Sequence, residues 1–155
     1  MNDEYRTLLA EAYKGELLGD AMFGCLADQE TGDDAEKLRA LQRVEATTAA
    51  QLRPLVLAAD AVVTADDEAT ARSQGAQIAE AGIPWDAFMK AMHDGLPPYL
   101  ASFVRLRSIA PDPSDPALVA LVNHEQAINA FIELELAGNA DRSLAVLQWH
   151  LDSVS

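Results

Sequence analysis

Apolar residues recur at intervals of three and four along most of this chain of 155 residues. That spacing gathers them on one face of an α-helix. Alanine and leucine dominate the apolar positions, and β-branched residues are sparse, which also favours helices. The pattern predicts an all-α protein with one domain over residues 1–155.

Four long helices follow from the apolar spacing and from the residues at its ends. We predict them over residues 3–27, 33–54, 84–106 and 116–137. Pro84 suits a first helical turn, and Gly138 marks a helix end. Pro54 predicts a kink or an end of the second helix, and the pair Pro97 and Pro98 predicts a kink or a break in the third.

The connections between these helices predict the topology. The first and second helices are joined by a short turn, and the third and fourth by a proline-rich loop over residues 110–116. The second and third are separated by a long crossover, which carries a short, weakly apolar surface helix over residues 66–81. A short C-terminal helix follows over residues 141–153. Two helical hairpins joined by one crossover form a four-helix bundle that differs from the simple up-down-up-down arrangement.

Three glutamates, Glu16, Glu45 and Glu125, interrupt the apolar faces of three of these helices. The interrupted runs are Tyr5, Leu9, Ala12 and Phe23; Leu38, Leu41, Leu52 and Leu55; and Leu118, Leu121, Val122, Ile128 and Ile132. Each carboxylate should therefore point into the bundle. An isolated buried carboxylate is costly, so each must share a proton, meet a cation or bind a metal. Gly15 and Gly19 flank the first glutamate and would let another helix approach closely.

The three carboxylates are predicted to lie at one level of the bundle. Glu16 stands about as far before the first turn as Glu45 stands after it, and Glu125 lies near the middle of its helix. Like charges at this separation either raise one another's pKa values or are neutralised by a cation. Oxygen ligands suit a hard or borderline metal ion. The cluster is therefore either a metal site or a group of side chains that share protons.

The three histidines are further candidates. His124 neighbours Glu125 but is turned from it by about 100° on the helix, so it is either a metal ligand or a partner in a surface or interhelical hydrogen bond. His93 is best explained as a polar residue with its own partners. His150 belongs to the C-terminal helix, which either caps the bundle or folds back far enough to bring His150 to the level of Glu125.

This arrangement resembles the ferritin-like superfamily, the diiron-carboxylate type of four-helix bundle. The resembling segments are residues 13–16, 44–48 and 124–127. Members commonly hold two iron or manganese ions with glutamates from two helices and Glu-x-x-His from the other two. The resemblance implies Glu16, Glu45 and Glu125 as ligands.

Several positions depart from that pattern. Thr48 stands where the resemblance implies a histidine after Glu45, and Ile128 stands three residues after Glu125. The third long helix has no glutamate. A single-metal site or a vestigial site fits this ligand set better than a complete dimetal centre.

Charge and composition narrow the partners. The net charge is −14, from 25 acidic and 11 basic residues, which disfavours nucleic acid and anionic lipid. We expect no membrane span and no secretory signal, hence a cytoplasmic protein. No phosphate-binding glycine loop is present, so no nucleotide cofactor is expected. Cys25 is predicted to be a buried thiol, and Glu133 and Glu135 a solvated face.

Two functional hypotheses remain from the sequence. In the first, core glutamates bind iron or manganese for oxidase or hydroxylase chemistry, and Phe23, Tyr99 and Phe103 wall a pocket for a small apolar ligand. In the second, the bundle has a vestigial site and acts as a structural or interaction module, with the glutamates paired to groups such as Thr48 and Asn129. A homodimer through the exposed faces of the third and C-terminal helices is predicted in either case.

Overall fold

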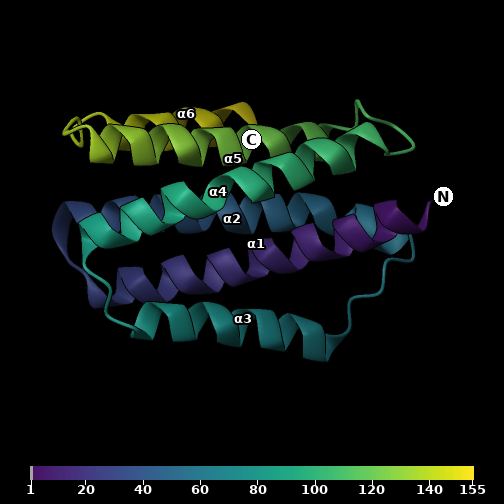
Figure 1. The fold of residues 1–155 in the computed structure, drawn as a ribbon, viewed down its shortest axis with the longest axis horizontal. Helices are drawn as coiled ribbons and strands as arrows, with labels where there is room; N and C mark the ends of the chain where they lie inside the picture. The colour runs from purple at the N-terminus through teal and green to yellow at the C-terminus, as the bar shows by residue number, and fades with distance from the viewer. Residues whose placement is uncertain (1) are drawn as a thin grey trace.

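The computed structural model describes residues 2–155, and these form six α-helices without a strand (Figure 1). The prediction of an all-α protein is confirmed. In chain order the helices are α1 (Asp3–Gln29), α2 (Gly32–Ala58), α3 (Ala65–Glu80), α4 (Trp85–Ser108), α5 (Pro116–Leu136) and α6 (Ser143–Ser153).

Local sequence signals explain where several helices begin and end. The side chain of Asn2 caps α1. Thr64 and Asp67 form a reciprocal capping box at the start of α3. Asp115 caps α5, whose first residue is a proline. Gly138, with φ +79°, takes the left-handed conformation just after that helix ends. These signals lie within the sequence itself, so the predicted helix ends agree with the structure to within a few residues.

Proline does not end or break either helix that contains it internally. α4 runs continuously through Pro97 and Pro98, so the predicted break is wrong. α2 continues past Pro54 to Ala58. All three prolines are exposed, so water can hydrate the carbonyls that lose their helical partners. Packing of the opposite face of α4, through residues such as Leu96, then holds the helix together.

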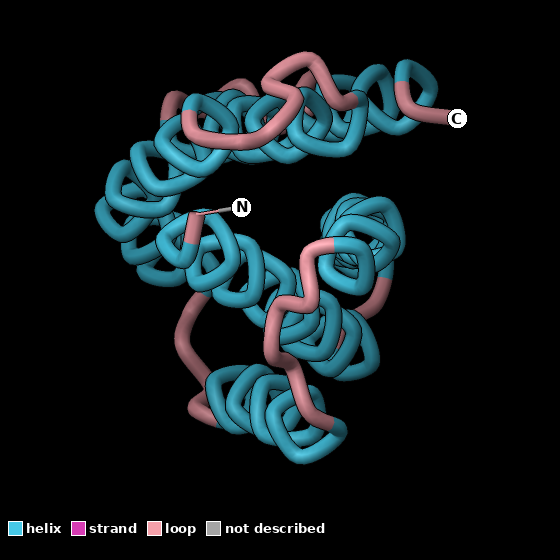
Figure 2. The backbone as a smooth tube through the Cα atoms, turned by 90° about the vertical axis from the view of Figure 1, so that its right-hand side faces the viewer, coloured by secondary structure: helices cyan, strands magenta, loops and turns pink. Residues whose placement is uncertain are grey.

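The helices pack in an arrangement that leaves α3 on the outside. α1 packs against α2, α3 and α4, while α5 packs against α4, α2 and α6. α3 runs back along the length of the molecule, so α4 starts at the same end as α2 and the two run in the same direction (Figure 1). Seen from the side, α3 covers α1 on one face, and α5 with α6 forms the opposite layer (Figure 2).

The contact between α3 and α1 depends on one glycine. A Cβ atom on Gly75 would lie 2.2 Å from the carbonyl oxygen of Leu18 and 3.0 Å from the amide nitrogen of Met22. Only a residue without a side chain lets the two backbones approach this closely. Ala71 and Ala79 are the other buried residues of α3, so this helix contributes little to the main core.

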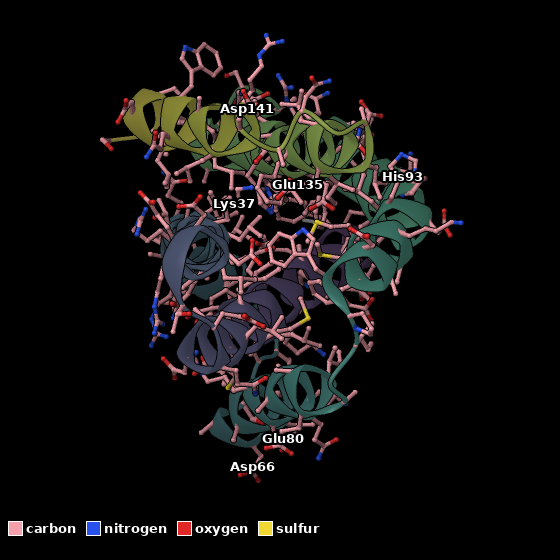
Figure 3. The ribbon with its side chains drawn as sticks, turned by 90° about the vertical axis from the view of Figure 1, so that its left-hand side faces the viewer. Lys37, Asp66, Glu80, His93, Glu135 and Asp141 are labelled. Carbon is pink, nitrogen blue, oxygen red and sulfur yellow. The ribbon has the colours of Figure 1, made fainter. Side chains whose placement is uncertain are left out.

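Two predictions about polar and thiol groups on α5 and α1 need correction. Glu135 does not belong to a solvated face, because its side chain is 3% exposed and its Oε1 accepts a hydrogen bond of 2.9 Å from Lys37 Nζ. The two residues face each other between α2 and α5 (Figure 3). Cys25 is only half-buried, so it is not the buried thiol that the sequence predicts.

The surface of the molecule bears on two predictions, the absence of a membrane span and the formation of a homodimer. Among residues 2–155, no helix combines the length and apolar character needed to cross a membrane. Exposed apolar side chains include Tyr99 and Val104 on α4 and Trp149 on α6. They lie on the helices predicted to form a homodimer, which stays a prediction.

Candidate metal centre

Four side chains from three helices meet in the interior. Glu16 comes from α1, Glu45 from α2, and His124 with Glu125 from α5. From His124 Nε2 the nearest carboxylate oxygens are Glu16 Oε2 at 3.0 Å, Glu125 Oε2 at 3.5 Å and Glu45 Oε2 at 3.7 Å. One ligand atom each from Glu16, Glu45 and His124 lie within 4.8 Å of one another. The three glutamates do converge, and a histidine stands among them.

His124 occupies the centre of this group and not the surface. Its side chain is fully buried, and its Nδ1 donates a hydrogen bond to the carbonyl of Leu121, which can only accept. That bond directs Nε2 toward the carboxylates, the arrangement by which proteins orient metal-binding imidazoles. The ring also packs on Phe103, with centroids 5.8 Å apart and planes inclined by 32°. The surface alternative for His124 is therefore wrong.

The helix itself held the signal for this orientation. His124 follows Leu121 by three residues and precedes Ile128 by four, so it shares their apolar face. Glu125 lies on the other border of the same face. An angle of about 100° between two neighbours lets both point inward when the centre of the face falls between them.

Among residues 2–155, two buried atoms of this centre have no hydrogen-bond partner. These atoms are Glu16 Oε2 and His124 Nε2, which lie 3.0 Å apart, within ion-pair distance, but form no hydrogen bond. The partners predicted for a non-metal cluster are engaged elsewhere: the Thr48 hydroxyl donates to the carbonyl of Val44, and the Asn129 amide donates to Glu133. Buried polar atoms without partners are costly. A cation placed among them would offset that cost.

Burial and mutual charge shift the acid–base properties of the group. Burial, followed by the charge on Glu16, raises the pKa of Glu45 well above its ordinary value. Burial alone would lower the pKa of His124, but the negative charges of Glu16 and Glu45 outweigh it and raise that pKa. Burial raises the pKa of Glu125 to about 7, against an opposing effect of His124. The metal-free centre thus retains protons that a metal ion would displace.

Gly19 makes room for one of the carboxylates. A Cβ atom at this position would lie 2.7 Å from Glu45 Cδ and 2.9 Å from its Oε1. A Cβ on Gly15 would meet nothing within 4 Å. The expected close approach of a second helix at these glycines is therefore wrong at Gly15, and at Gly19 a side chain fills the space. Apolar periodicity carries no signal for this role, because it depends on a partner in another helix.

An apolar cavity of about 360 Å³ adjoins the centre. Glu16, Glu45 and Glu125 lie on its wall. The three aromatic residues predicted to wall a pocket, Phe23, Tyr99 and Phe103, all line this cavity. Its lining also includes apolar residues that were not predicted for the pocket: Met22, Phe88, Met92 and Ile132. Three exposed residues at its border, Ile78, Ile83 and Tyr99, make its entrance apolar as well.

The other two histidines lie outside the centre. His93 is 41% exposed on α4 (Figure 3), with its Nε2 3.8 Å from a carboxylate oxygen of Glu133. His150 is buried on α6. Burial, and then the charge on His124, lowers the pKa of His150. α6 folds back against α5 and α2, so of the two predicted arrangements the structure has the folded-back one. Within residues 2–155, His150 forms no ion pair with the three carboxylates.

Comparison of the chain with models of known protein families, with characterised proteins and with solved structures gives no match. The case for a function therefore rests on the centre and the cavity beside it.

Proposed function

We propose that this protein is a ferritin-like helical bundle that binds one iron or manganese ion. Glu16, Glu45 and His124 hold the ion, with the Glu125 carboxylate at the margin of the centre. The observation that carries the proposal is the pair of buried, unpartnered ligand atoms, Glu16 Oε2 and His124 Nε2, facing each other beside two more carboxylates.

The arrangement of helices supports the ferritin-like part of the proposal. The long helices α1, α2, α4 and α5 each contact two others of this set, and α3 connects α2 to α4 along the length of the molecule (Figure 1). Carboxylates from two hairpins project to one interior level, as in bundles that bind metals between facing helices. α4 supplies no carboxylate, which favours a single ion over two.

The donor set favours a borderline divalent ion. Carboxylate oxygens with one imidazole nitrogen suit manganese or iron, whereas a soft ion would prefer thiolate or thioether ligands. The hydrogen bond from His124 Nδ1 to the Leu121 carbonyl fixes the tautomer that leaves Nε2 free. With neutral imidazole, the charges of Glu16 and Glu45 balance those of one divalent ion.

Bound iron would supply the oxygen-dependent redox chemistry of an oxidase or hydroxylase. The chain itself provides the surroundings for it. Phe103 covers the His124 ring and helps to keep water from the centre. The cavity, whose wall includes Glu16 and Glu45, would place a small apolar molecule beside the ion. The side chains thus hold the ion, orient its histidine ligand and provide an adjacent dry space.

Metal content tests this proposal most directly. Freshly purified protein should contain iron or manganese by elemental analysis, and chelator-treated protein should rebind about one ion per chain under anaerobic conditions. Glu45→Gln should lower metal affinity by at least about tenfold. Glu133→Gln, an exposed carboxylate on the same helix as His124, is the matched control and should bind metal normally. Substoichiometric binding by the unaltered chain would refute the metal site.

The second hypothesis, a non-catalytic bundle with a vestigial site, predicts a different outcome for Glu45→Leu. Replacing a buried, unneeded carboxylate by an apolar side chain should leave stability unchanged or raise it, both with and without added manganese. If Glu45 is a ligand, the variant should instead lose the stabilisation that manganese gives to the unaltered chain. Urea unfolding with and without manganese separates the two cases.

A further inference from the structure

The cavity beside the proposed metal centre has an unusual charge distribution. Within the described part of the chain, residues 2–155, its charged wall residues are all acidic, namely Glu16, Glu45 and Glu125, and no lysine or arginine lines it. The remaining wall is mostly apolar and includes four aromatic side chains: Phe23, Phe88, Tyr99 and Phe103. An occupant must therefore be largely apolar, and no basic side chain in the wall would pair with an anion.

Glu125 is the carboxylate that the metal does not need. One divalent ion balances Glu16 and Glu45, and Glu125 is not among the three groups whose ligand atoms lie within 4.8 Å of one another. Its side chain is nonetheless only 12% exposed and lies on the cavity wall. A carboxylate that the ion does not bind is thus left facing a mostly apolar space.

We propose that the cavity binds a hydrophobic amine in its cationic form, with the ammonium group against Glu125 and the apolar body among the aromatic side chains. This inference rests on the proposed function and names the ligand class of the same site. The volume of about 360 Å³ lies at the lower end of the range for small-ligand sites. Phe23, Phe88 or Phe103 would add cation–π attraction near the charged end.

The alternatives are disfavoured by the same charges. With one divalent ion balancing Glu16 and Glu45, a hydrophobic carboxylate would still meet the Glu125 carboxylate and no basic side chain. A neutral hydrocarbon or alcohol would fill the space but leave Glu125 without an opposite charge. The net charge of −14 also raises the concentration of cations, and lowers that of anions, near the entrance.

Three isosteric probes test the ligand class. We suggest calorimetric titration of manganese-loaded protein with phenylbutylamine, phenylbutanol and phenylbutanoate. The amine should bind at least about tenfold more tightly than the alcohol, because both can donate a hydrogen bond to Glu125 but only the amine brings an opposite charge. The carboxylate should not bind detectably. Equal or tighter binding of the alcohol or the carboxylate would overturn the inference.

Two variants locate the bound amine. Glu125→Gln should retain one manganese ion per chain and lose the preference for amine over alcohol. Gly95→Leu should weaken binding of the amine and of the alcohol alike, because Gly95 lines the cavity and a Cβ there meets no atom within 4 Å, which leaves a leucine side chain room to enter it. An amine preference that survives Glu125→Gln would contradict the assignment.

Metal content, measured in the same samples, separates this inference from the proposed function. If manganese stays bound and the amine shows no preference, only the ligand class is wrong. If the amine displaces manganese, the two cations share one site and the division between the metal ligands and Glu125 is wrong. If the unaltered chain never binds manganese, the proposed function fails and this inference fails with it.

Discussion

At the scale of single residues, the centre depends on atoms that apolar periodicity does not reveal. The Leu121 carbonyl decides which nitrogen of His124 faces the carboxylates. Gly19 decides whether the Glu45 side chain has room. The contact of His124 with Leu121 lies within α5, whereas the contact of Gly19 with Glu45 joins α1 and α2. Each makes the centre sensitive to small changes that would leave the helices intact.

Gly19→Ala should therefore damage the centre without unfolding the protein. The new Cβ would clash with the Glu45 carboxylate, which is the flexible end of a side chain and can swing away. We expect manganese affinity to fall about tenfold or more, while the helix gains intrinsic propensity. Calorimetric titration measures the first effect and urea unfolding of metal-free protein the second.

Gly15→Ala is the matched control, since it makes the same change one turn earlier in α1 and its Cβ meets no atom within 4 Å. Its manganese affinity should equal that of the unaltered chain. Equal affinity in both variants would show that the space at Gly19 does not matter for the centre.

The stability of metal-free protein should fall as pH rises, because of Glu125. Its pKa is about 7 in the folded chain, above its ordinary value of 4.5, so the folded state binds more protons between these values. The stabilisation that Glu125 gives to the folded state is fully present below about pH 4.5 and is lost as the pH rises through about 7. The free energy of unfolding changes by on the order of 3 kcal/mol over this range. Manganese should reverse the trend, because its ligands must be deprotonated.

This pH dependence is measured as the difference in unfolding free energy between the unaltered chain and Glu125→Gln, both treated with chelator, at about pH 5 and about pH 8. Taking the difference removes the effect of titrating groups that do not interact with Glu125. A difference that is constant or that grows with pH would show that Glu125 titrates normally.

At the scale of helices, the pairing of α2 with α5 includes a buried ion pair. Lys37 and Glu135 are 11% and 3% exposed, and their charged atoms lie 2.9 Å apart (Figure 3). Burial makes such a pair costly to form and more costly to break, because removing one partner leaves the other charge uncompensated. The pair thus fixes how the two helices sit against each other more than it adds to stability.

Lys37→Met should therefore destabilise the protein by about 3 kcal/mol or more, whereas the double variant Lys37→Met with Glu135→Leu should recover most of that loss. Urea unfolding of the two variants measures both effects. Arg105→Ala, which breaks the exposed pair with Glu4 (2.8 Å between Arg105 Nε and Glu4 Oε1), should cost far less because water screens it. A double variant as unstable as the single one would contradict this account.

At the scale of the whole molecule, the excess of negative charge opposes the folded state. With 25 acidic and 11 basic residues, repulsion outweighs the exposed ion pairs, and both are screened by salt. Raising sodium chloride from about 0.02 to about 0.5 M shortens the screening length several-fold. We therefore expect the urea midpoint of metal-free protein to rise with salt at neutral pH. Near the isoelectric point of about 4.3, the urea midpoint should not rise with salt. At neutral pH, a urea midpoint that falls with salt would show that the ion pairs outweigh the repulsion.

The sequence by itself determined the helices and most of their ends, because apolar spacing, Pro116 and Gly138 act through near neighbours along the chain. It also determined that Glu16, Glu45 and Glu125 face inward, since a stripe fixes the direction of every residue on it. These inferences need no knowledge of which helix lies beside which.

Only the tertiary structure decided what surrounds those carboxylates. The approach of His124 Nε2 to Glu16, the space at Gly19 and the partnership of Lys37 with Glu135 each join residues far apart in sequence. Such contacts depend on the rotation of one helix against another, and periodicity leaves that rotation free by tens of degrees. The continuity of α4 through Pro97 was settled in the same way, since the packing of the whole helix outweighs a local preference to break.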